Sequence, residues 1–158
     1  EGKADIAVWN EGGVRLSRMP AGPITVNQVL TLDPFGNPCI EMNITGKELY
    51  DLMKACYVND ENRFPLTSSN IACTITIDKA NQANIKRLVI SDDKGKPLDM
   101  KKTYRVVMNS YVASICDSPR KDQGRDTNLL TADMIIAHLE KVGKVSYAGK
   151  RCRKMVLQ

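Results

Sequence analysis

The chain has 158 residues, of which 42% are hydrophobic and 26% charged, and it carries a formal net charge of +5. A chain of this length buries roughly two thirds of the surface that it exposes when unfolded, so we expect one globular domain with one core. The composition excludes a disordered or fibrous protein. Apolar runs such as residues 134–137 are far shorter than the roughly 20 residues that cross a bilayer, so we expect no membrane span.

Basic residues are spread along the chain and are densest at residues 120–125 and 150–154. Aromatic residues make up only 5% of the chain and are not interleaved with the basic ones. Single-stranded nucleic acid is bound by basic grooves that also carry stacking aromatic residues. We therefore expect solvated basic loops and no nucleic-acid partner.

The residues that most often ligate metals are few: one histidine, His138, and five cysteines, Cys39, Cys56, Cys73, Cys116 and Cys152. No Cys-x-x-Cys pair is present, so we expect no structural zinc site. Because the number of cysteines is odd, at least one thiol is unpaired or pairs outside the chain, and the sequence leaves open whether an internal disulfide forms. A single histidine with scattered carboxylates also argues against a metal centre or a Ser-His-Asp triad. We expect no catalytic residue and no metal ligand in this chain.

The predicted elements begin with a buried strand at residues 4–9, which ends in the loop Asn10-Glu11-Gly12-Gly13. Thr25 then caps a short helix. This helix should end near Asp33, because a proline follows and disfavours helical backbone in the residue before it. Residues 39–44 alternate as a second strand.

The clearest helix signal follows this strand. Thr45-Gly46-Lys47-Glu48 is a capping box, in which the Thr and Glu side chains satisfy backbone N–H groups at the start of a helix. The apolar residues after it recur at helical spacing and predict a stripe that faces the core: Leu49, Leu52, Met53, Cys56 and Tyr57. A polar loop at residues 59–64 comes next.

Strands predominate in the remainder. β-Branched residues predict strands at 72–77 and 85–91, joined as a meander, and another at 103–109. Residues 114–127 form the longest irregular segment, and long loops often carry function.

A last helix begins at a Thr131 cap, and a short strand at residues 155–157 closes the chain. One face of this helix carries Ile135, His138, Leu139 and Val142, so His138 is expected to be a partly buried structural residue rather than a ligand. The order of the elements predicts an α+β fold, a mixed and largely antiparallel sheet with a few packed helices. Neither a repeat nor a linker divides the chain, so residues 1–158 should form a single domain.

A glycine pair directly follows the first predicted strand. Asn10, Gly12, Gly13 and Arg15 lie close together in sequence. Glycines let backbone N–H groups approach a ligand, and an arginine can form paired hydrogen bonds with phosphate or ribose oxygens. A tight turn explains the same glycines without a ligand, and both interpretations stay open at this point.

Aromatic residues in two loops are further candidates. Phe35 stands between a proline and a glycine, where a large ring is either exposed and able to stack or packed inward. Tyr111 follows the strand at 103–109, and Asp117 lies in the irregular segment after it. A ring that stacks on a base and a carboxylate that accepts from ribose hydroxyls could together hold a nucleoside.

Several motifs in series carry a resemblance to a known family. They are Ala4-Asp5-Ile6-Ala7 with Asn10-x-Gly12-Gly13-Val14-Arg15, Pro20-Ala21-Gly22-Pro23-Ile24-Thr25, Pro34-Phe35-Gly36-Asn37, Thr45-Gly46-Lys47-Glu48-Leu49 and Lys102-Thr103-Tyr104-Arg105-Val106. In their order and spacing, from about Ala4 to Val156, the chain resembles the C-terminal domain of the 5'-nucleotidase family, which includes UDP-sugar hydrolases and 2',3'-cyclic phosphodiesterases.

In that family an N-terminal metallophosphoesterase domain holds two divalent metal ions, of the zinc or manganese type, and the catalytic residues. The C-terminal domain binds the nucleoside part of the substrate. The resemblance therefore implies a nucleotide-recognition domain that lacks the metallophosphoesterase domain and the helix that usually precedes its first strand. It implies a nucleoside monophosphate or related nucleotide as ligand, no cofactor in this chain and no hydrolysis by this chain alone. Family members are mostly periplasmic, cell-surface or secreted, and the resemblance implies the same location here.

The resemblance also implies roles for individual residues. The base would lie between Phe35 and Tyr111, with Asn37 at its edge. Asp117 would bind the ribose. The loop that faces ribose and phosphate would consist of Asn10, Gly12, Gly13 and Arg15.

One segment departs from the family pattern. Where the family commonly has Gly-Gly-Asp-Gly and an aromatic residue, this chain has Ile115-Cys116-Asp117-Ser118-Pro119. Side chains in place of glycines remove easy access to positive φ and crowd the ribose position. A second hypothesis therefore stays open: a stand-alone binding or interaction module whose nucleoside site is degenerate.

Overall fold

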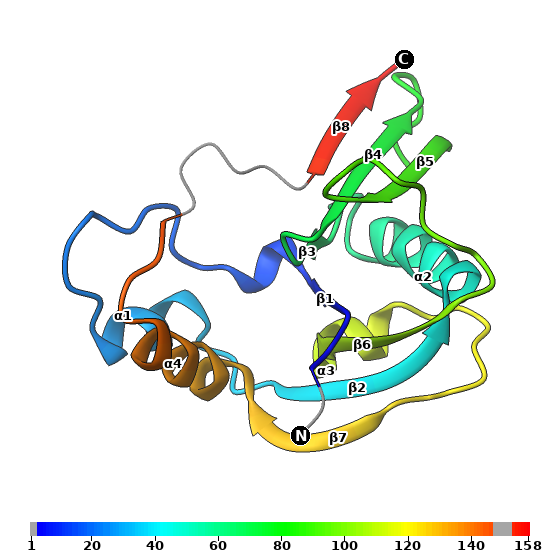
Figure 1. The fold of residues 1–158 in the computed structure, drawn as a ribbon. Helices are drawn as coiled ribbons and strands as arrows, with labels where there is room; N and C mark the ends of the chain where they lie inside the picture. The colour runs from blue at the N-terminus through cyan, green and yellow to red at the C-terminus, as the bar shows by residue number, and fades with distance from the viewer. Residues whose placement is uncertain (1–2, 147–152) are drawn as a thin grey trace.

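A computed structural model describes residues 3–146 and 153–158 of the chain (Figure 1). Strands and helices alternate irregularly along it. In chain order they are β1 (Ile6–Trp9), the 3-10 turn η1 (Glu11–Gly13), α1 (Val26–Leu32), β2 (Pro38–Thr45), α2 (Gly46–Asn59), β3 (Leu66–Thr67), β4 (Ile71–Ile77), β5 (Ile85–Asp92), β6 (Thr103–Asn109), α3 (Ser110–Ile115), β7 (Arg125–Leu130), α4 (Thr131–Val142) and β8 (Arg153–Leu157).

The strands form two sheets, with the orders β3-β1-β6-β2-β7 and β5-β4-β8. β1 pairs with β6 and β4 with β8 in parallel, whereas the other paired strands are antiparallel. The predicted α+β class with a mixed, largely antiparallel arrangement is confirmed. The expected meander is limited to β4 and β5, because β6 leaves them and inserts between β1 and β2 of the larger sheet.

Helix α2 lies between the two sheets and contacts strands of both, β2 in one and β5 in the other (Figure 1). Its predicted capping box is present: the backbone N–H of Glu48 donates to Thr45 Oγ1, and Glu48 accepts from the Thr45 backbone N–H at 2.7 Å. The whole predicted apolar stripe is buried in the core. The stripe therefore joins the two sheets into one hydrophobic core.

Three strands of the larger sheet bring distant segments to one edge. β1 and β6 run parallel, with Val8 opposite Met108, so both strands end on the same side. β2 runs antiparallel to β6, with Cys39 opposite Asn109, so β2 begins where β6 ends. The segments that leave β1 and β6 and the segment that enters β2 therefore meet. We call this side, formed by residues 10–15, 33–37 and 110–117, the loop edge.

Two elements within and beside the predicted irregular segment were not expected. α3 extends over Ser110–Ile115, and β7 extends over Arg125–Leu130. The prediction that residues 114–127 are irregular is therefore wrong at both ends. β7 is an edge strand with almost every side chain exposed, so it has no alternation of apolar and polar residues to reveal it.

Helix α4 is present at the predicted place, but its predicted packing is wrong. Its N-cap residue is Leu130, which makes no side-chain cap, and the Thr131 hydroxyl instead donates to the carboxylate of Asp33. The face that carries His138 and Val142 is only partly covered, and both of these side chains are exposed. Sequence periodicity predicted which residues share a face but not whether another element covers it.

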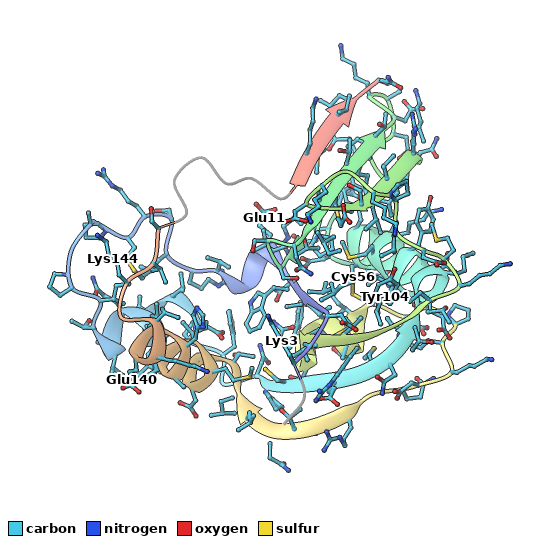
Figure 2. The ribbon with its side chains drawn as sticks, viewed as in Figure 1. Lys3, Glu11, Cys56, Tyr104, Glu140 and Lys144 are labelled. Carbon is cyan, nitrogen blue, oxygen red and sulfur yellow. A yellow bond between two sulfur atoms is a disulfide. The ribbon has the colours of Figure 1, made fainter. Side chains whose placement is uncertain are left out.

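A disulfide joins Cys56 of α2 to Cys116, which directly follows α3 (the Cys56 label in Figure 2 marks its α2 end). Both cysteines are buried. Cys73 is buried as well. Cys39 is a buried free thiol, and burial, helped by the nearby charge of Asp33, raises the pKa of Cys39 to about 11. Cys39 therefore stays protonated at neutral pH. The remaining cysteine, Cys152, lies outside the described residues.

Candidate functional site

The two asparagines at the ends of β1 and β6 join the first part of the loop edge. The side-chain amide of Asn109 donates to Asn10 Oδ1 at 2.9 Å, and both residues are buried. Asn109 Oδ1 also accepts from the backbone N–H of Val112 at 2.8 Å and so caps α3. One buried side chain therefore fixes both the loop after β1 and the helix that carries Tyr111.

The segment with Phe35 is held at both of its ends. Asp33 accepts from the Thr131 hydroxyl, and the carbonyl of Asn37 accepts from the Thr131 backbone N–H at 3.0 Å. Gly36 has φ +60°, a conformation that glycine adopts without strain, and this lets the chain turn directly after Phe35. The ring of Phe35 is 47% exposed at the tip of this turn.

Tyr111 lies in the first turn of α3 and is 40% exposed. The side chain of its neighbour Ser110 donates to Asn37 Oδ1 at 3.3 Å. This contact connects the segment of Tyr111 with that of Phe35, although the two are far apart in sequence. Both rings therefore reach the surface from connected segments, and neither belongs to the buried core.

The glycine pair belongs to a tightly packed turn. A Cβ atom at Gly13 would lie 2.7 Å from Asn10 Oδ1 and 3.1 Å from Trp9 Nε1, so a larger residue would displace the buried asparagine. The backbone N–H of Arg15 donates to the carbonyl of Leu32 at 2.9 Å. The turn therefore has a structural reason for at least one of its glycines, and it places Arg15 beside the segment of Phe35.

Asp60 and Arg63 also lie at this edge and were not identified from the sequence. β3 pairs antiparallel with β1, with Trp9 opposite Leu66, so the loop that precedes β3 meets the end of β1. Arg63 Nη2 donates to Oδ1 of the buried Asp60 at 3.0 Å, and this hydrogen bond raises the pKa of the Arg63 guanidinium.

The Asp60–Arg63 pair touches two of the predicted site segments. The same Asp60 oxygen lies 3.5 Å from the Tyr111 hydroxyl. On the other side, the Arg63 guanidinium packs on the backbone of Gly12, where a Cβ atom would lie 3.3 Å from its Cζ. The sequence analysis identified residues 59–64 only as a polar loop. The one sequence signal that could have revealed the pair is the separation of three residues between Asp60 and Arg63.

Asp117 is the one predicted site residue that no described contact ties to the others. Its side chain is exposed, and it forms no hydrogen bond or ion pair with another described residue. Residues 115–119 contain no positive φ, so the backbone does not need the glycines that are missing there. The neighbouring disulfide at Cys116 fixes the start of this segment.

No group of three or more potential metal ligands occurs among residues 3–146 and 153–158. Within the same described ranges, no helix is both long and apolar enough to cross a membrane.

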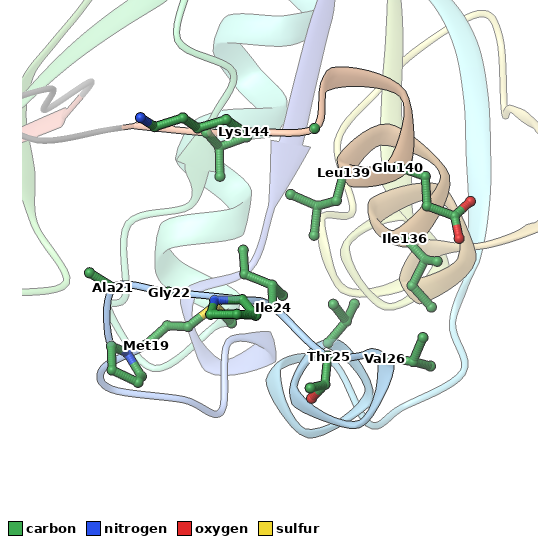
Figure 3. A pocket seen from close by; sticks show the side chains of 15 residues that line it. Met19, Ala21, Gly22, Ile24, Thr25, Val26, Ile136, Leu139, Glu140 and Lys144 are labelled. Atoms are coloured by element: carbon green, nitrogen blue, oxygen red, sulfur yellow. The ribbon is translucent and has the colours of Figure 1, made fainter.

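A described groove lies outside the set of predicted site residues. It has a volume of about 1040 Å³ and lies between α4 and the segment from Met19 to Val29, which includes part of α1 (Figure 3). Its lining is mainly apolar and contains Ile24, Val26, Ile136 and Leu139, but none of the predicted site residues.

The comparisons agree with this architecture. A family model described as the C-terminal domain of 5'-nucleotidases matches residues 1–120. The chain therefore belongs to the 5'-nucleotidase C-terminal domain family.

Two curated relatives show how much of a longer protein this chain represents. It is 32% identical to Protein UshA of Escherichia coli over 144 residues, which are 87% of this chain and 24% of that protein. It is 35% identical to a 5'-nucleotidase of Vibrio vulnificus over 145 residues, which are 88% of this chain and 24% of that protein. The chain thus spans about a quarter of the length of these relatives.

A solved structure also matches over part of its length. The 5'-nucleotidase precursor of Thermus thermophilus is 29% identical, with a TM-score of 0.74, and the match covers 97% of this chain and 32% of that one. Nearly the whole chain therefore shares the fold of the matching part of that 5'-nucleotidase.

Proposed function

We propose that this chain is the substrate-recognition domain of a 5'-nucleotidase-type phosphoric ester hydrolase. It binds the nucleoside part of a nucleotide, while an N-terminal metallophosphoesterase domain with two divalent metal ions hydrolyses the phosphate. The observation that carries this proposal is the pair of exposed rings, Phe35 and Tyr111, on segments that the Asn37–Ser110 hydrogen bond connects.

Each candidate residue has chemistry suited to one part of a nucleotide. The faces of Phe35 and Tyr111 stack on the base, and each stack contributes about 1–3 kcal/mol. Asn37 offers amide hydrogen bonds to the edge of the base. Arg15 attracts the phosphate, and Asp117 accepts from ribose hydroxyls, since its carboxylate is exposed and has no described partner. Asn10 and the glycines 12 and 13 shape the loop that faces ribose and phosphate.

The division of labour has a direct test. Because the described residues contain no group of ligands for a metal pair, the purified chain should not release phosphate from AMP, even with added zinc or manganese. Phosphate release is measured colorimetrically, with calf phosphatase as a positive control. Zinc- or manganese-dependent turnover by the pure chain would contradict the proposal.

A second candidate function is a stand-alone binding module with a degenerate nucleoside site. The isolation of Asp117 and the side chains in place of glycines around it favour this alternative. Titration of the chain with adenosine and with AMP separates the two functions. Saturable binding that depends on Phe35 supports nucleotide recognition, whereas no binding at millimolar ligand supports the degenerate module.

The disulfide supports a location outside the reducing cytosol. Structural disulfides persist in the periplasm, at the cell surface and in secreted proteins, and they are rare in the cytosol. The Cys56–Cys116 bond is buried within the core, so it belongs to the folded state of the domain. We therefore propose a periplasmic, cell-surface or extracellular protein that acts in nucleotide breakdown.

A further inference from the structure

The guanidinium of Arg15 lies against the ring of Phe35. Its Cζ atom is 4.9 Å from the ring centroid, well within the range of about 6 Å for an attractive cation–π contact. Phe35 stands at the tip of a turn with almost half of its surface exposed, and the contact with Arg15 is the one described for its ring. Arg15 is therefore in a position to restrict where this ring points.

Arg15 is itself well placed to act as a support. The hydrogen bond from its backbone N–H to the carbonyl of Leu32 ties its loop to the end of α1, directly before the segment of Phe35. Among the described residues its side chain forms no ion pair, so its charge is not committed to a carboxylate. The contact with Phe35 is the one described interaction of the guanidinium.

We infer that Arg15 is a positioning residue for the base-stacking ring of Phe35, and that the site therefore uses Arg15 to recognise uncharged nucleosides as well as nucleotides. The inference rests on the proposed function, because it assigns Phe35 to the base. It differs from a phosphate contact alone, in which Arg15 would matter only when the ligand carries a phosphate.

The ligand that separates these roles is adenosine, which has no phosphate. Arg15→Ala should weaken adenosine binding about two- to fivefold, the size of an exposed cation–π contact. It should weaken AMP binding more, because the phosphate loses its cation as well. Arg15→Lys should recover part of the adenosine affinity, since an ammonium can also lie over a ring, as Lys102 does at 4.9 Å from the centroid of Tyr104.

Arg18→Ala is the matched control, because Arg18 is exposed in the same loop and its loss removes the same charge. It should leave adenosine affinity unchanged. Two results would overturn the inference. Adenosine affinity that does not change in Arg15→Ala would leave Arg15 with no effect on the base. Tighter adenosine binding would mean that the guanidinium occupies the face that the base requires.

A second measurement does not depend on any ligand. The chain contains two phenylalanines, Phe35 and the buried Phe64, so labelling with 4-fluorophenylalanine gives two 19F signals. Arg15→Ala should shift the signal of Phe35 and leave that of Phe64 in place, and Arg18→Ala should move neither. If the wild-type chain binds no nucleoside, the proposed function fails, and the 19F spectra still decide whether Arg15 positions the ring. An unshifted Phe35 signal in Arg15→Ala refutes the contact.

Discussion

At the scale of single residues, Phe35 is the side chain whose removal should change binding most. Phe35→Ala deletes one stacking face, which is worth about 1–3 kcal/mol, and should weaken adenosine binding roughly 5- to 150-fold. Its effect on the free energy of unfolding should be small, because the ring is 47% exposed. Calorimetric titration and urea unfolding of the same variant check both expectations.

Met100→Ala is a suitable control for this variant. Met100 is also a large, exposed apolar side chain, but it precedes β6 and so lies at the other end of that strand from Tyr111. It should change neither affinity nor stability. Equal loss of binding in both variants would show that the effect of Phe35 is not local.

At the scale of residues, the sequence pointed to candidate side chains whose binding roles stay predictions. Phe35 and Tyr111 were proposed from loop position and family resemblance, and the structure exposes both. Asp60 and Arg63 were missed, because a polar loop gives no sign that one of its carboxylates is buried. That burial depends on β3 lying beside β1, which no local pattern encodes.

At the scale of elements, α3 is a short helix fixed mainly from outside. Asn109 caps its start, and at its end Asn59 Nδ2 donates to Ile115 O at 2.6 Å and Arg120 Nη1 donates to Cys116 O at 2.9 Å. The disulfide adds a covalent link to α2. Since a helix of six residues has little stability of its own, these links explain why periodicity did not predict it.

Removal of the disulfide should destabilise the domain strongly. The bond closes a loop with a sequence separation of 60 residues, and the chain-entropy relation gives about 4 kcal/mol for a loop of this length. The double variant Cys56→Ala/Cys116→Ala should lose about this much free energy of unfolding, as measured by urea unfolding. A reducing agent should also lower the stability of the wild type. Equal stability of wild type and variant without reductant would contradict the prediction.

At the scale of the whole molecule, stability should fall in acid. The backbone N–H of Thr45 holds the pKa of Glu48 below its ordinary value of 4.5, and that of Asn43 holds the pKa of Asp122 below 3.8. A carboxylate whose pKa is lower in the folded than in the unfolded state stabilises the folded state. Its full contribution is present at pH values above the unfolded pKa. This stability is lost as the pH falls through the folded values, so the free energy of unfolding should decrease below a pH of about 4.5.

Urea unfolding at a series of pH values tests this decrease. Glu48 also accepts from the backbone N–H of Lys121 at 2.9 Å, so both carboxylates fasten residues 121–124 to the larger sheet or α2. Glu48→Gln should be less stable at neutral pH and should show a flatter acid limb. A free energy of unfolding that stays constant across this pH range in the wild type would contradict the assignment.

The arrangement of the whole molecule was only partly predictable. Alternation and capping motifs predicted α2 and most strands, because these elements carry their own local signals. The position of β6 between β1 and β2 depends on strand pairing across large sequence separations, and so does the hydrogen bond between Asn10 and Asn109. The predicted α+β class is correct. The loop edge could not be predicted, because it follows from the order of the strands in the sheet.

The most direct test of nucleoside recognition is to observe which protons of the chain approach a bound base. Intermolecular nuclear Overhauser effects should connect the adenine protons of adenosine to the rings of both Phe35 and Tyr111, and not to the buried Phe64. Effects to Ile24, Ile136 or Leu139 in the groove between α1 and α4, without any to the two rings, would contradict the claim.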